Sequence, residues 1–143
     1  MSITYNDEKK DLPSDQLKRL FVLAGWCDDS DDDDDMSRHF NAPFIRSTLV
    51  ISAWDDARLV GVVRVMSDTI IRAVIYDLVV DPAYRRQGIG GDLVRRCMAH
   101  FPNAEWLVQT TADLTAYYEK LGFAVYHDVV LTIPSIYQSD AED

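Results

Sequence analysis

The sequence lacks several features that would place it in a well-defined class of protein. It has only two cysteines, Cys27 and Cys97, and no CxxC pair, so we expect no disulfide framework and a reduced, cytoplasmic setting. No stretch of about 18 apolar residues could cross a membrane, and the N-terminus lacks the apolar core of a secretory signal. His39, His100 and His127 are scattered without metal-ligand spacing, so no metal site is expected.

Basic residues are also few. The 14 Lys and Arg residues face 24 Asp and Glu residues, and the formal net charge is −10. Since nucleic-acid binding needs a basic surface, no nucleic-acid partner is expected. Seven acidic residues lie in the run 28–35, whereas Arg85, Arg86, Arg95 and Arg96 form a basic cluster. An anionic and a cationic ligand would explain this division, and the alternative is that the acidic run is a solvated loop.

The length of 143 residues and the apolar content of 48% predict a single domain over 1–143. The acidic run is expected to be a loop and the tail 138–143 to be frayed. The apolar spacing predicts helices at 14–24, 36–41, 90–101 and 114–121, with Pro43 ending the second. It predicts strands at 3–5, 44–54, 58–66, 70–80, 105–109 and 123–133. This order indicates an α+β fold with a mixed, mostly antiparallel sheet and one βαβ crossover.

The stretch 79–91, VVDPAYRRQGIGG, carries the strongest functional signal. A strand is expected to end at Val80, and Gly88 and Gly90 allow the backbone to approach a ligand closely. The N–H groups of the following helix and the charge of Arg85 would form an anion site. A Walker A loop is absent and the dinucleotide pattern GxGxxG is not matched. The alternative is that a glycine merely allows close packing of helix and strand.

Two segments resemble the GCN5-related N-acetyltransferase (GNAT) family. Arg85-x-x-Gly88-x-Gly90 resembles its pyrophosphate-binding motif R/Q-x-x-G-x-G/A, and 117–123, YYEKLGF, resembles its FYEKLGF segment. The spacing between them leaves room for one helix and one strand, as in the family. The resemblance covers residues from about 12 to about 130. Within the family the chain is similar to small single-domain members, including plant plastid serotonin N-acetyltransferases and their bacterial relatives.

The resemblance implies a GNAT-like sheet flanked by about four helices, with two splayed strands that hold acetyl-CoA. Backbone groups of Leu78, Val79 and Val80 would bind the pantetheine arm, and the Val80 N–H would face the thioester carbonyl. Thr111 lies nearest to the place where many members carry a cofactor-contacting Asn, so the chain departs from the family there. The pyrophosphate would be held by Arg85 together with the backbone amides of Arg86, Gln87, Gly88, Ile89, Gly90 and Gly91.

The resemblance further implies direct attack of an amine on the thioester within a ternary complex. Asp77 is the candidate base, with an inert carboxylate as the alternative. Tyr118 is the candidate acid that protonates the leaving thiolate, with Tyr117 as the second choice, and one of the two is expected to be a packing residue. Trp26 is the candidate substrate-binding residue, which would stack on the amine or attract its ammonium group, and it could equally cap the core.

The function that these residues favour is acetylation of a small primary amine by acetyl-CoA. The alternatives are a peptide or protein N-acetyltransferase and a non-catalytic module that binds acyl-CoA. Members of the family often form dimers, so a homodimer is an expected state, although no sequence feature identifies an interface.

Overall fold

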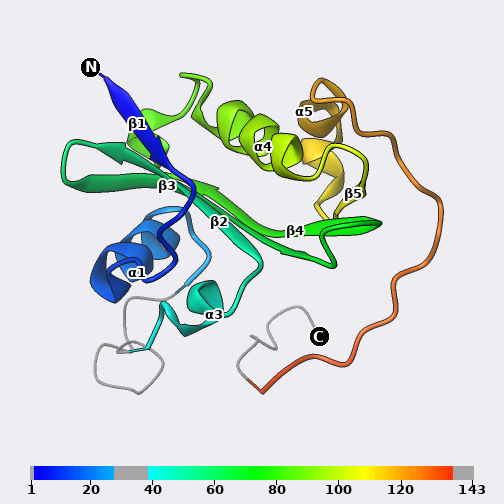
Figure 1. Cartoon of the computed structure of the whole chain (residues 1–143), viewed down its shortest axis with the longest axis horizontal. Helices are drawn as coiled ribbons and strands as arrows, with labels where there is room; N and C mark the ends of the chain where they lie inside the picture. Colours follow the sequence, from blue (N-terminus) through cyan, green and yellow to red (C-terminus); the bar gives the residue numbers. More distant parts are fainter. Residues whose placement is uncertain (1, 28–38, 137–143) are drawn as a thin grey trace.

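The computed structural model describes residues 2–27 and 39–136 as one five-stranded sheet with helices on both faces (Figure 1). The strands are β1 (Ile3–Asn6), β2 (Leu49–Asp55), β3 (Arg58–Ser67), β4 (Arg72–Val80) and β5 (Glu105–Val108). The helices are α1 (Ser14–Leu23), α3 (Ala42–Ile45), α4 (Ile89–His100) and α5 (Thr115–Glu119), with two 3-10 turns, η1 (Pro82–Tyr84) and η2 (Ala112–Leu114). No helix of the described ranges is long and apolar enough to cross a membrane.

The strands lie in chain order, and this order confirms the predicted mixed sheet. β1 to β4 form an antiparallel meander, and Asp56 makes the turn between β2 and β3 with a φ of 56°. β5 then pairs with β4 in parallel, which requires a crossover, and α4 supplies it.

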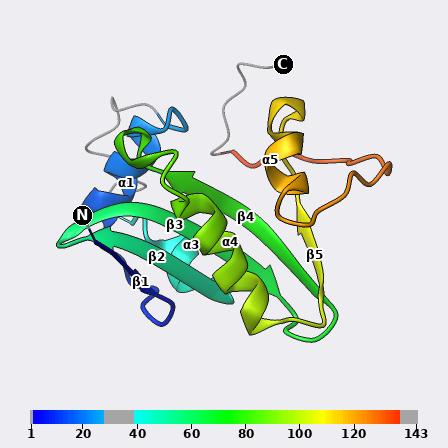
Figure 2. The same cartoon turned by 90° about the horizontal axis from the view of Figure 1, so that it is seen from above.

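Both faces of the sheet are covered, and this explains the valine-rich sequence of its central strands. α4 lies on one face, and α1 and α3 lie on the other (Figures 1 and 2). On the α4 side, fully buried Leu93, Val94 and Cys97 pack against strand residues such as Val63. Burial raises the pKa of the Cys97 thiol to about 12, so this cysteine is a packing residue, as predicted. The second face is filled by Leu12, Leu17, Leu20, Phe21, Phe44, Val50, Leu59, Val62 and Val79.

The prediction around Pro43 is wrong in detail. Pro43 does not end a helix; it lies at the beginning of α3, and Phe44 is a buried helical residue rather than the first residue of a strand. Proline suits the first turn of a helix because its missing N–H has no partner to lose there and its φ is already helical. Most of the predicted helix at 36–41 lies outside the described residues, as do the acidic run and the tail.

The predicted final strand at 123–133 is also absent from this chain. Residues 123–135 have no regular secondary structure, and in Figures 1 and 2 the segment leads away from the body of the protein. The apolar pattern is typical of a strand, but a strand also needs a neighbour for its N–H and C=O groups. Within the described residues no backbone hydrogen bond joins 124–134 to another strand, so the pattern alone does not produce one.

A buried carboxylate connects β4 to the loop that follows it. The side chain of Asp81 is almost fully buried; one of its oxygens accepts a hydrogen bond from the Ala83 N–H at 2.9 Å, and the other pairs with the half-exposed Arg58 at 3.2 Å. The Tyr84 hydroxyl donates to Asp55 at 2.6 Å. These contacts fix the direction in which the chain enters residues 85–88.

We expect Arg58→Met to destabilise the protein more than Asp81→Asn. The first variant leaves a buried carboxylate without its cation, at a cost of about 2–4 kcal/mol. The second keeps an acceptor for the Ala83 N–H and leaves the half-exposed Arg58 to water, at a cost of about 1 kcal/mol. Urea unfolding measures the loss of stability in both variants. Equal losses would show that the Arg58–Asp81 ion pair does not stabilise the connection between β4 and the following loop.

Candidate functional site

β4 continues beyond the point where its pairing with β5 ends, and the two segments diverge there (Figure 2). Their pairing runs from Arg72 and Glu105 to Ile75 and Val108, whereas β4 continues to Val80. On its other side β4 contains an extra residue, because Arg64 faces Asp77 while its neighbour Val65 faces Ile75. Such a bulge bends a strand and increases its twist. From Tyr76 onward, β4 therefore has β3 on one side only.

The register shows which backbone groups of β4 face this opening. The Asp81 N–H donates to the Val60 carbonyl at 2.8 Å, which makes these two residues a hydrogen-bonded pair. Since hydrogen-bonded and non-hydrogen-bonded pairs alternate in antiparallel strands, Val79 is bonded to β3, whereas Leu78 and Val80 turn their N–H and C=O groups away from it. The backbone groups of Leu78 and Val80 therefore face the opening, whereas those of Val79 face β3.

The loop between η1 and α4 has the backbone shape of an anion site. Arg86 has a φ of 66° and Gly88 a φ of 83°, so two left-handed residues immediately precede the 12-residue helix α4. Left-handed residues in such a turn aim successive N–H groups into one concavity, and the helix dipole adds positive potential. The Arg85 Nε donates to the Val80 carbonyl at 3.3 Å, which brings its guanidinium to the end of the open strand.

The basic cluster predicted from the sequence divides into two pairs with different surroundings. Arg95 lies 3.6 Å from the Asp92 carboxylate, and Arg96 covers the Tyr5 ring at 4.1 Å from its centroid. The Arg95 contact therefore lies within α4, whereas Arg96 joins α4 to Tyr5 of β1. Arg85 and Arg86 form no ion pair with another described residue, so they are the members of the cluster that an anionic ligand could use.

The two tyrosines of α5 have different environments. The ring of Tyr118 is 8% exposed and packs edge-on against Tyr117 and Phe123, at 5.1 and 5.6 Å between centroids. Burial, with a smaller contribution from Tyr117, raises the pKa of Tyr118 to about 12. The Tyr117 hydroxyl instead lies over Gly90, where an added Cβ would overlap it. This link between α5 and the glycine loop had no signal in the sequence beyond the glycine itself.

Asp77 lies on the α1 and α3 side of the sheet, in an ion pair. Its Oδ2 accepts a hydrogen bond from the Arg64 Nε at 2.7 Å, and both side chains are mostly buried. The Arg64 guanidinium also lies 5.7 Å from the Phe44 ring centroid and 5.5 Å from that of Tyr76. Sequence reasoning missed Arg64, although a single arginine within the valine-rich run 58–66 is a usable signal.

Residues at the end of α1 approach the same region. Burial raises the pKa of the Cys27 thiol, the charge of Lys18 lowers it, and the charge of Asp77 raises it by a smaller amount, so Cys27 lies near Asp77. The neighbouring Trp26 is 54% exposed and touches Phe21 edge-on at 5.6 Å. Trp26 therefore rests on the core by one edge and leaves the rest of its indole accessible. The acidic run 28–35 that follows lies outside the described residues.

Comparison with known families decides the class of this fold. A model of the acetyltransferase (GNAT) domain matches residues 9–131. The chain belongs to the GNAT acetyltransferase family. The match includes both the Arg85–Gly90 loop and the YYEKLGF segment, on which the resemblance in sequence rested. Among the described residues of this GNAT chain, no group of three or more His, Cys, Asp or Glu side chains could hold a metal ion.

Individual relatives agree with this assignment. Over 108 residues the chain is 34% identical to mycothiol acetyltransferase of Corynebacterium efficiens. The matched region covers 71% of this chain but only 35% of that protein. A GNAT family acetyltransferase of Streptococcus pneumoniae has the same fold, with a TM-score of 0.75 and 22% identity over 96% of this chain and 100% of the other. So does an aminoglycoside acetyltransferase from a soil metagenome, solved with sisomicin, with a TM-score of 0.71 and 23% identity over 94% and 96%.

We expect the effect of Gly90→Ala on the free energy of unfolding to depend on the residue at position 117. The substitution should destabilise the protein beside tyrosine and stabilise it beside phenylalanine. With Tyr117 present, the new methyl group overlaps the hydroxyl and costs about 1–3 kcal/mol. In a Tyr117→Phe background the nearest ring carbon would be 3.5 Å away, and alanine then stabilises the helix by up to about 1 kcal/mol. A double-mutant cycle by urea unfolding measures this coupling, and additive effects would contradict the contact.

Proposed function

We propose that this protein transfers the acetyl group of acetyl-CoA to the amino group of a small cationic amine. The observation that carries the proposal is the open edge of β4, where the backbone N–H groups of Leu78 and Val80 lie beside the anion-binding loop at 85–88. A pyrophosphate suits the loop, and an amide-rich pantetheine arm suits a strand edge without a neighbour. The two free thiols of the described residues support a cytoplasmic setting.

The residues of the chain then have the following roles. The Val80 N–H donates to the thioester oxygen as negative charge develops on it, while the amine nitrogen forms its bond to the carbonyl carbon. The Oδ1 of Asp77 forms no contact that the structure describes, and it holds the incoming amine and receives its proton, directly or through a water. The C–S bond breaks, and the Tyr118 hydroxyl gives its proton to the leaving sulfur and recovers one from solvent.

The ion pair with Arg64 determines which oxygen of the Asp77 carboxylate can accept a proton. A proton on Oδ2 would have to displace the guanidinium, so the available oxygen is Oδ1. A carboxylate held in this way is a stable negative charge, and it would attract a cationic amine before the amine is deprotonated. Tyr76, which is 55% exposed and lies beside the Arg64 guanidinium, and the accessible face of Trp26 provide aromatic surface that could contact the amine.

A small acceptor is favoured over a peptide. One relative is named for mycothiol and a structural neighbour was solved with sisomicin, and both are small molecules. A peptide or protein N-acetyltransferase is the second candidate, because the acidic residues of 28–35 would attract basic peptides as well.

The first experiment measures release of free CoA thiol with a panel of amines. The panel contains tryptamine and serotonin, spermidine, aminoglycosides, single amino acids and a basic peptide. We expect turnover with a small cationic amine, together with thermal stabilisation of the protein by acetyl-CoA alone. Stabilisation without turnover on any acceptor would favour a non-catalytic acyl-CoA-binding module, and turnover on the peptide alone would favour the second candidate.

Tyr118→Phe is expected to lower kcat by about 10- to 100-fold, at the low end of general acid catalysis because a thiolate is a good leaving group. Thermal stabilisation by acetyl-CoA should persist, since the backbone groups that bind it are unchanged. Tyr117→Phe is the matched comparison on the same helix. A loss confined to Tyr117→Phe would move the acid role to that residue.

Asp77→Asn is expected to lower kcat by about 100-fold, because the group that receives the amine's proton is lost. It should also raise KM for a cationic amine by about 10- to 100-fold, since a hydrogen bond to a charged group is lost. Asparagine keeps an oxygen for the Arg64 Nε, so the fold should remain. Asp113→Asn, an exposed acid near α5, serves as the control. If Asp77→Asn lowers only stability and leaves kcat and KM unchanged, Asp77 is a structural partner of Arg64 and nothing more.

The pH dependence provides a further test. Because burial raises the pKa of Tyr118 to about 12, its proton remains in place well above the ordinary tyrosine value. We therefore expect kcat not to fall between about pH 8 and about pH 10 through loss of this proton. A decline in that window that disappears in Tyr118→Phe would contradict the assignment.

A further inference from the structure

The bulge in β4 places two consecutive side chains on one face of the sheet. In a regular strand Ile75 and Val79 would face the same side, because side chains alternate. Ile75 instead packs in the buried cluster on the α4 side, and Val79 in the cluster on the α1 and α3 side. Between them, Tyr76 and Asp77 both contact the guanidinium of Arg64. The bulge thus sets an aromatic ring and a carboxylate side by side.

Each partner of the Arg64–Asp77 ion pair keeps one polar atom without a hydrogen bond. The Arg64 Nε donates to the Asp77 Oδ2 at 2.7 Å, and Nη1 donates to the Ser47 hydroxyl at 3.4 Å. Within the described residues, Nη2 and Oδ1 form no such bond. No nitrogen or oxygen of these side chains is both buried and unpaired, so the two atoms are accessible. Nη2 shares the planar fork with Nε, so the open donor lies beside the open acceptor.

We propose that the acceptor is an amino acid, whose ammonium group contacts the Asp77 Oδ1 and whose carboxylate accepts a hydrogen bond from the Arg64 Nη2. This inference rests on the proposed function and narrows its acceptor to an amine with a carboxylate beside it. A neighbouring donor and acceptor of opposite charge suit a ligand that carries the complementary pair, and in an α-amino acid one carbon separates the two groups. A peptide N-terminus has an amide in that place, and a polyamine has no anionic group.

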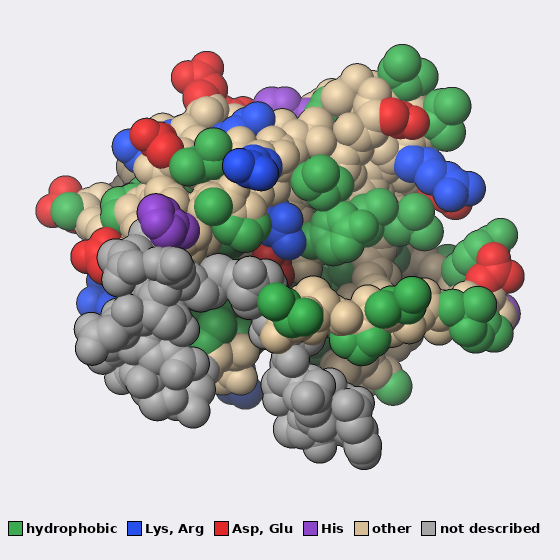
Figure 3. Space-filling view, turned by 90° about the horizontal axis from the view of Figure 1, so that it is seen from below, with side chains coloured by type: hydrophobic (Ala, Val, Ile, Leu, Met, Phe, Trp, Pro, Cys, Tyr) green, Lys and Arg blue, Asp and Glu red, His purple; other side chains and the backbone are tan. Residues whose placement is uncertain are grey.

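The neighbours of Arg64 fix its position and leave room for the side chain of the amino acid. The guanidinium lies 5.7 Å from the ring centroid of the buried Phe44, and the buried Ser47 donates to the Pro43 carbonyl at 2.7 Å. The Tyr76 ring is 55% exposed and provides apolar surface beside the ion pair. Figure 3 views the α1 and α3 side, where the surface is hollowed and charged side chains of both signs lie near hydrophobic ones.

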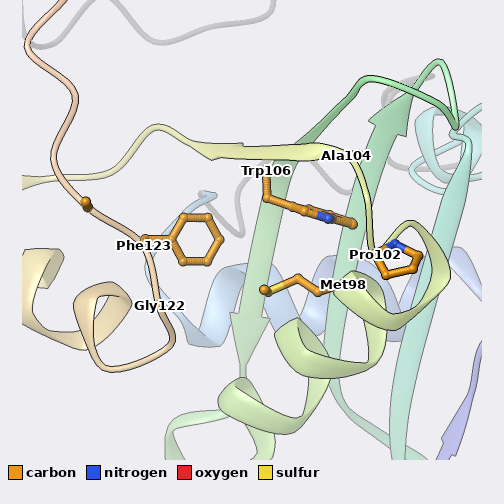
Figure 4. Close-up of a pocket in the computed structure, with 7 residues that line it drawn as sticks. Met98, Pro102, Ala104, Trp106, Gly122 and Phe123 are labelled. Atoms are coloured by element: carbon orange, nitrogen blue, oxygen red, sulfur yellow. The ribbon is translucent and has the colours of Figure 1, made fainter.

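A cavity on the other face of the sheet lacks these charges. Its volume is about 450 Å³, and Met98, Trp106 and Phe123 line it (Figure 4). These three side chains pack against the buried cluster on the α4 side. None of the described residues that line the cavity is charged. An ammonium or carboxylate group would lose its hydration there without gaining a partner, so this cavity does not suit a zwitterion.

Release of CoA thiol with matched acceptors tests the need for a carboxylate. Leucine, methionine and phenylalanine are each compared with the corresponding amino acid amide and decarboxylated amine. We expect kcat/KM for the preferred amino acid to exceed that of its amide by about 10- to 100-fold, the effect of a charged hydrogen bond. Equal or faster turnover of the amides and amines would overturn this inference and leave the proposed function standing. No thiol release with any amine would overturn both.

Arg64→Lys tests which residue reads the carboxylate. Lysine keeps a cation for Asp77 but has no planar fork that serves two carboxylates at once. We expect kcat/KM for the amino acid to fall by about 10-fold and that for its amide to change by less than about threefold. Arg72→Lys, in an exposed ion pair at the far end of β4, is the matched control and should change neither. Equal losses for both substrates would reduce Arg64 to a support for Asp77 and overturn the inference.

Titration calorimetry of the unaltered protein gives a readout that depends on neither turnover nor a variant. With CoA present in place of acetyl-CoA, no acetyl group is available and binding alone is measured. We expect the preferred amino acid to bind about 10- to 100-fold more tightly than its amide. Equal affinities, or tighter binding of the amide, would overturn the inference.

Discussion

The separation of β4 from β5 is the constraint on which the rest of the site depends. A single extra residue at Tyr76 lets β4 turn out of register with β3 and diverge from its parallel neighbour. Strand backbone groups normally find partners on both sides, so an opened strand within a sheet is an unsatisfied surface that a ligand can complete. The bulge thus leaves part of β4 without a second neighbouring strand, and the proposed acetyl-CoA site uses this edge.

β4 also organises the charges of the site along its length. Beyond its carboxyl end, Asp81 directs the chain into the left-handed loop where positive potential collects. Near its middle, Asp77 provides a negative charge that Arg64 holds in place. An anionic donor and a cationic acceptor would therefore meet the same strand at different points, and the thioester would lie between them. The net charge of the whole protein, −10, conceals this local division.

α5 joins this site to the segment 123–135, which has no regular secondary structure. Tyr117 touches the glycine loop, and Tyr118 is buried. The chain then passes Gly122, with a φ of 104°, into residues 123–135. The helix has only five residues, so its position depends on its contacts rather than on its own hydrogen bonds.

The amino-acid sequence by itself determined the layers of this fold and the place of its anion loop, because hydrophobic periodicity and glycines near a helix start are local signals. It placed β1, β3, β4, α1 and α4 to within a few residues. It did not show Arg64 against Asp77 or Tyr117 over Gly90, since each contact joins residues far apart in sequence. It also predicted a strand at 123–133 from a correct apolar pattern. Only the tertiary structure showed that this segment has no neighbouring strand among the described residues, because strand pairing depends on a partner that periodicity cannot reveal.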